Sequence, residues 1–110
     1  MKNLKLIILL LIIFALGCTK DKTSVEHECE SNSPSFNTQV LPIFQNNCSN
    51  CHASQTPILN DYSSISQSAE SALSAMQHVS AIMPPYPSVK LSDSLIQIVN
   101  CWIHNGKQDN

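Results

Sequence analysis

The chain offers few residues from which to build a core. Apolar residues recur at regular spacing only after Pro34, so about 76 of the 110 residues, from 35 to 110, form the predicted folded domain. A core of this size is marginal alone, and such small domains usually depend on a disulfide, a metal or a cofactor. Glycine occurs twice and aromatic residues make up 5%, which disfavours many short strands joined by tight turns. We therefore expect an all-α domain.

Apolar residues at helical spacing predict a helix at each end of this domain. The first helix begins near Thr38, or earlier with a kink, because Pro42 lacks an amide hydrogen and suits a first turn; it ends by Asn47. The last helix follows Ser92 as its N-cap and stops at Gly106. The two apolar stripes are formed by Phe36, Val40, Leu41, Ile43 and Phe44 in the first helix, and by Leu95, Ile98, Val99, Trp102 and Ile103 in the last.

Between these helices the sequence predicts one further helix and a stiff loop. Residues Ser68 to Ile82 carry apolar side chains on one side, and Asp61 or Ser63 is suited to cap a short helix before them. Met83–Pro87 contains three prolines, which fix an extended loop.

The N-terminal residues are typical of an export signal. Lys2 and Lys5 precede an apolar run of eleven residues, Leu6–Leu16, which is too short for a spanning helix of roughly 20 residues. The sequence Ala15-Leu-Gly-Cys18 resembles the bacterial lipobox, which implies cleavage before Cys18 and acylation of its sulfur. Ordinary cleavage and an uncleaved anchor are the alternatives. Residues 1–17 are then a signal peptide, and residues 18–34 are a lipidated cysteine and a polar tether.

A short motif carries the chemistry of the domain. Cys48-Ser-Asn-Cys51-His52 matches the C-x-x-C-H signature of covalent haem attachment. Two thiols three residues apart in a turn can each add to one of the two haem vinyl groups. The histidine that follows the second thiol then lies under the iron as its proximal ligand. The expected cofactor is one haem c.

Two other kinds of site use a C-x-x-C pair. Zinc would need further ligands from Cys29, Cys101, His78 or His104, none of which forms a second close pair. A redox dithiol usually lies on a βαβ scaffold, which this sequence does not show. An export signal favours haem, because c-type haem is attached outside the cytoplasm.

The region 36–106 resembles the small monohaem cytochrome c family. The resemblance is carried by Val40-Leu-Pro-Ile-Phe-Gln-Asn-Asn-Cys48, by Met83-Pro-Pro-Tyr86, and by Leu91-Ser92 and Trp102-Ile103. It implies a cytochrome c-like fold, in which the N- and C-terminal helices cross beside one covalently bound haem. It also implies that Phe44 and Trp102 meet at this crossing.

The resemblance implies that Met83 is the sixth ligand of the iron. Met83 lies in a proline-stiffened loop, which holds a weak thioether ligand at little entropic cost. Met76 is expected in the core, because it lies on a helical stripe. The other candidates for the sixth ligand are His27, His78 and His104. Each of them is otherwise expected to be an ordinary solvent-exposed histidine. An open sixth position is a further alternative.

Of the five cysteines, Cys18 is assigned to lipid, and Cys48 and Cys51 to haem, which leaves Cys29 and Cys101. In an oxidising compartment such a leftover pair suggests a disulfide. The family's first and last helices touch, so the chain before the first could reach the last. Alternatively, Cys101 is a small buried residue and Cys29 is free in the tether.

These features predict a one-electron carrier rather than an enzyme. The chain shows no paired acids and no nucleophile beside a base, so we expect no small-molecule substrate. A net charge of −2 gives no sign of a nucleic-acid partner. Redox partner proteins and a membrane, reached through Cys18, are the expected partners, in the bacterial cell envelope outside the cytoplasm. The rival hypothesis is a haem-based sensor or small-ligand binder with a labile or open sixth position.

Overall fold

The computed structural model describes residues 29, 31, 33–77 and 81–110. The predicted signal peptide, Cys18, His27 and His78 lie outside these residues. The described part contains helices and no strands, so the all-α prediction is confirmed. None of the described helices is long and apolar enough to cross a bilayer. The elements are η1 (Phe36–Val40), α3 (Leu41–Asn47), α4 (Ser49–His52), α5 (Tyr62–Gln77) and α6 (Asp93–His104).

The first helix begins at Phe36 with a widened turn. This is the earlier of the two starts that the sequence allowed, before Thr38. The amide of Val40 donates to the Ser35 carbonyl and that of Leu41 to the Phe36 carbonyl, five residues back in each case. Pro42 then falls in the first turn of α3, where its missing amide hydrogen leaves no bond unmade. The Ser35 hydroxyl accepts from the Thr38 amide and caps the start.

Helix α5 differs from the prediction at both ends. It runs without a break from Tyr62, and the carboxylate of Asp61 caps it by accepting from the Ser64 amide at 2.9 Å. The predicted helical end at Ile82 is wrong. Ile82 and Met83 both donate their amides to the Ala75 carbonyl, so the chain folds back over the end of α5 instead of extending it.

Helix α6 ends as the sequence predicts. Gly106 has a φ of +88°, a left-handed conformation that glycine adopts without a steric penalty. Its amide donates to the Ile103 carbonyl, and the Lys107 amide donates to the Trp102 carbonyl. This pair of bonds is a Schellman motif, which satisfies carbonyls at the end of the helix.

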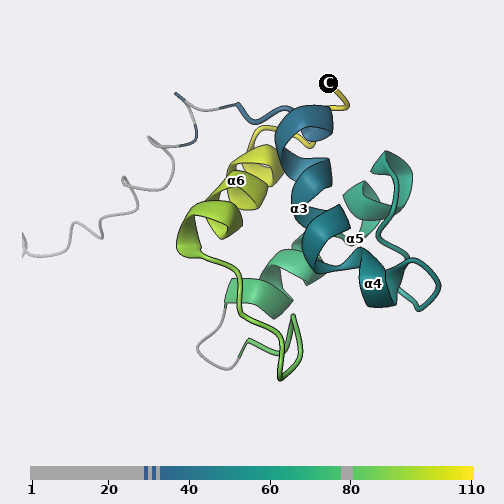
Figure 1. Cartoon of the computed structure of the whole chain (residues 1–110). Coiled ribbons are helices and arrows are strands. Elements are labelled where there is room, and N and C mark those ends of the chain that lie inside the picture. Colours follow the sequence, from purple (N-terminus) through teal and green to yellow (C-terminus); the bar gives the residue numbers. More distant parts are fainter. Residues whose placement is uncertain (1–28, 30, 32, 78–80) are drawn as a thin grey trace, which may run out of the picture.

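Helix α6 lies alongside η1 and α3, with α5 behind them (Figure 1). The apolar core between them centres on an aromatic cluster. The ring of Phe36 lies 5.4 Å from Trp102 and 5.1 Å from Tyr62, measured between centroids. The predicted pairing of Phe44 with Trp102 is wrong. Phe44 is buried in the same core but belongs to none of the ring pairs of the described residues, because the helices cross about two turns earlier.

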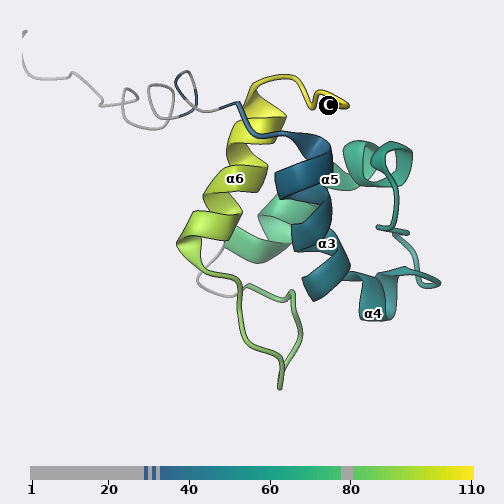
Figure 2. The same ribbon diagram turned by 45° about the horizontal axis from the view of Figure 1, so that its top comes forward.

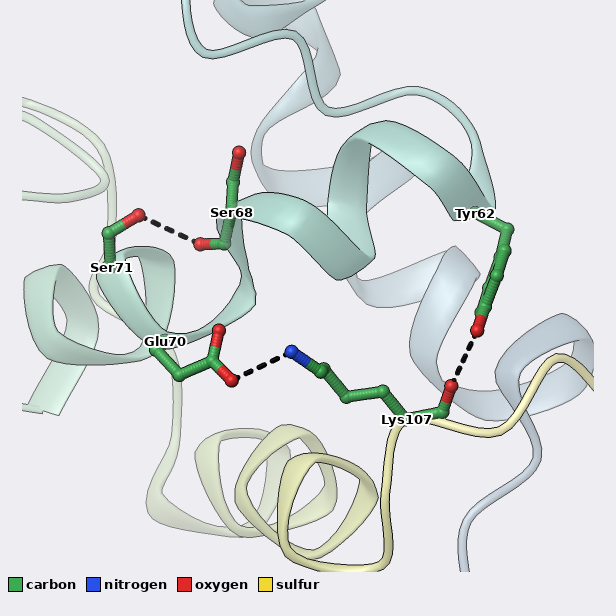
Figure 3. A network of polar contacts seen from close by, with 5 residues as sticks. All are labelled: Tyr62, Ser68, Glu70, Ser71 and Lys107. Atoms are coloured by element: carbon green, nitrogen blue, oxygen red, sulfur yellow. Dashed lines mark hydrogen bonds and ion pairs between the residues drawn. The ribbon is translucent and has the colours of Figure 1, made fainter.

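Lys107, the third residue after α6, ties that end of the chain to α5. Lys107 donates from its ammonium to the Glu70 carboxylate at 2.8 Å, and its carbonyl accepts from the Tyr62 hydroxyl at 2.7 Å (Figure 3). In the same view Ser71 donates to the Ser68 carbonyl within α5. The hydrogen bond from Lys107 lowers the pKa of the Glu70 carboxyl from its usual value.

The folded unit includes part of the segment predicted as a tether. Cys29 is bonded to Cys101 of α6, and both are buried. Pro34 is buried as well. The main-chain oxygen of Asn110 accepts from Ser35 and Asn37, so the end of the chain closes over the start of the first helix. Packing of this segment against α6 therefore supplies the covalent staple that a small core needs.

Candidate functional site

The C-x-x-C-H motif forms one helical turn, α4, directly after α3. The amides of Cys51 and His52 both donate to the Cys48 carbonyl, at 3.2 and 2.9 Å. Residues three and four apart in a helical turn are neighbours, so Cys51 and His52 each lie beside Cys48. The Ser49 hydroxyl donates to the Leu59 carbonyl and fastens this turn to the loop that follows.

The His52 ring is oriented by main-chain carbonyls. Its Nδ1 lies 2.8 Å from the Pro57 carbonyl oxygen and 3.3 Å from that of Gln55. A carbonyl oxygen only accepts hydrogen bonds, so Nδ1 carries the proton. The Nε2 atom then has a free lone pair, as a metal-ligating histidine requires. The amide of Leu59 donates to the His52 carbonyl and holds the loop against the motif.

The two cysteines of the motif have different surroundings. Cys48 is half-buried against the apolar core, and burial raises the pKa of its thiol to about 11. Cys51 is exposed, and neither cysteine belongs to a disulfide. Redox dithiols depend on a thiol whose pKa is lowered, so a raised pKa at Cys48 argues against that alternative.

The structure also weakens the zinc alternative. Cys29 and Cys101, two of its four candidate additional ligands, are committed to their disulfide. His104 lies exposed at the end of α6. Within the described ranges, no three His, Cys, Asp or Glu side chains gather as a metal-binding group.

Met83 comes from a separate loop, between α5 and α6. Its side chain is half-buried and is not part of the apolar core, whereas Met76 is buried in that core as its position on a stripe predicts. The loop that contains Met83 and α4 both lie toward the end of the molecule away from the C-terminus (Figures 1 and 2).

Large apolar side chains are exposed on the same loop. Ile82, Tyr86 and Val89 are 67%, 95% and 87% exposed. Isolated exposed apolar residues are ordinary, but three in eight residues form an exposed apolar stretch, the kind of surface that contacts another molecule. Two thiols and a histidine Nε2 within one turn of the chain are a donor set of the kind that holds a covalently bound haem.

Sequence reasoning missed two groups that position this site. The Pro57 carbonyl orients His52, and the Lys90 ammonium holds the Met83 loop. Both act on or through main-chain carbonyls. No residue pattern marks such contacts, because they depend on how the loops close.

Comparisons with known proteins supply no relative: no family model, no curated protein and no solved structure matches this chain.

Proposed function

We propose that this chain is a one-electron carrier with a single haem c, attached at Cys48 and Cys51 and ligated by His52 and Met83. The observation that carries the proposal is the orientation of His52. Its Nδ1 proton is held by the Pro57 carbonyl, which directs the ligating Nε2 to the opposite side of the ring. The spacing Cys48-x-x-Cys51-His52, with α4 as its helical turn, supports the same assignment.

Each residue has a defined task in this proposal. Cys48 and Cys51 would each hold the haem through a thioether bond, formed by addition of the thiol S–H across one vinyl group. His52 and Met83 would both ligate the iron, which would close it to substrates, and ligation by methionine would raise its reduction potential. The haem supplies a centre that takes up and releases one electron. The protein excludes water from it and keeps both ligands in place.

Anchoring outside the cytoplasm belongs to the same proposal. It is supported by the apolar run and the Ala15-Leu-Gly-Cys18 sequence, and the Cys29–Cys101 disulfide fits an oxidising compartment. The fold we propose is cytochrome c-like, because η1–α3 and α6 share one core and α3 leads directly into the haem motif.

The test is export in a bacterium that matures c-type cytochromes. The wild-type protein should retain haem on a denaturing gel and give the absorption spectrum of a low-spin haem c. A variant with Cys48→Ala and Cys51→Ala should carry no covalent haem. The matched control, Cys29→Ala with Cys101→Ala, removes two other cysteines and should still carry it. Wild-type protein without covalent haem, or a Cys48/Cys51 variant that retains it, would refute the proposal.

A further inference from the structure

Lys90 bridges two main-chain carbonyls of the loop that contains Met83. Its ammonium donates to the Ala81 carbonyl at 2.6 Å and to the Pro84 carbonyl at 2.7 Å. Ala81 lies two residues before Met83, and Pro84 follows it directly. One cation therefore draws together the main chain on both sides of the proposed ligand. A charged donor forms shorter and stronger hydrogen bonds than a neutral one, and the two bonds from Lys90 are short.

The main chain of Met83 is held on its other side by α5. The amides of Ile82 and Met83 both donate to the Ala75 carbonyl, at 3.2 and 3.3 Å. Farther along, the Ser88 amide donates to the Pro85 carbonyl and closes the tip of the loop. Met83 thus lies between two main-chain anchors, one from α5 and one from Lys90. The prolines of this loop have no amide hydrogen, so they cannot form a hydrogen bond that would replace either anchor.

We propose that Lys90 is a positioning residue for Met83. The inference rests on the proposed function, since it assigns Lys90 the task of keeping the Met83 thioether available to the iron. A thioether is a weak ligand and competes with any small molecule that reaches the sixth position. When the loop is held by Lys90, the state with Met83 withdrawn is less populated, and an added ligand binds more weakly in proportion.

The experiment measures the binding of imidazole to the oxidised holoprotein. Lys90→Met keeps most of the side-chain length but donates no hydrogen bond, and it should bind imidazole roughly tenfold more tightly than wild type. It should also weaken the red absorption band that reports methionine ligation. Lys90→Arg restores a charged donor and should return both readouts toward wild type. Lys107→Met, the control, removes a lysine that pairs with Glu70 and should leave both readouts unchanged.

A second readout examines the loop itself. Amide hydrogen exchange of Ile82 and Met83 should accelerate in Lys90→Met and stay at the wild-type rate in Lys107→Met. Unchanged imidazole affinity in Lys90→Met, even with lowered thermal stability, would overturn the positioning role and leave the haem assignment intact. Failure of the wild-type protein to carry haem would refute the proposed function and the role of Lys90 together.

Discussion

The Cys29–Cys101 disulfide should supply a large share of the stability of this domain. The bond joins residues 72 positions apart. On the loop-entropy model, closing a loop of that length destabilises the unfolded chain by roughly 4 kcal/mol. Small domains are stable by about 5–15 kcal/mol in total. Replacing both cysteines by alanine should therefore lower the melting temperature by roughly 15–30 °C.

Urea unfolding of the exported Cys18→Ser holoprotein measures this effect. The fluorescence of Trp102, the single tryptophan, follows the transition. Wild-type protein unfolded with a reductant is the matched control, because it keeps every side-chain atom and loses only the bond. The two forms that lack the bond should behave alike: the reduced protein and the double-alanine variant should each lose roughly 4 kcal/mol of unfolding free energy. A loss below about 1 kcal/mol in the reduced protein would refute the loop-closure argument.

Two further predictions concern the iron and the acid limit of stability. Met83→Ala should lower the reduction potential and let the ferrous protein bind carbon monoxide, which wild type should resist; rapid binding by wild type, unchanged by the substitution, would favour the sensor hypothesis. The pKa of Glu70 is lowered mainly by its hydrogen bond from Lys107, so the stabilisation it gives is present above its usual pKa of 4.5 and is lost as the pH falls through its lower folded value. The urea midpoint of Glu70→Gln should therefore lie below that of wild type at neutral pH and converge with it in acid; a constant difference would contradict this linkage.

The helices at the ends of the domain were predictable because their signals are local. Regular apolar spacing, the proline in the first turn of α3 and the glycine after α6 each act within a few residues. The start of α5 was harder to predict. Its first turns are rich in serine, and only packing of Ile65 and Ala69 into the core shows that they continue the helix.

The point where the helices cross could not be derived from the sequence. Phe36 and Phe44 both lie on the predicted apolar stripe, and either could meet Trp102. Tyr62 decides between them in the structure, because its ring packs edge-on against Phe36 and also faces Trp102. Tyr62 is placed there by a third helix. A pairing that depends on three elements leaves no trace in the spacing of any one.

The candidate site also has a part that the sequence predicts and a part that depends on how the chain folds. Cys48, Cys51 and His52 lie within five consecutive residues, so their chemistry and their closeness follow from the motif itself. The groups that orient them come from loops, and a loop carbonyl has no residue type by which to recognise it. The burial that raises the pKa of Cys48 also depends on the core packed against it.

The two ends of the molecule have different tasks in the proposed carrier. The disulfide and the contacts of Asn110 lie at one end, and α4 and the loop 81–92 lie toward the other (Figures 1 and 2). A chain lipidated at Cys18 would enter the domain at Cys29, and the ten residues between these attachment points allow a span of at most about 40 Å. Because the disulfide fixes Cys29 on α6, the entry point lies away from the haem motif. In the proposed carrier the motif would then lie toward the end of the domain opposite the lipid anchor, which would leave it accessible to a redox partner.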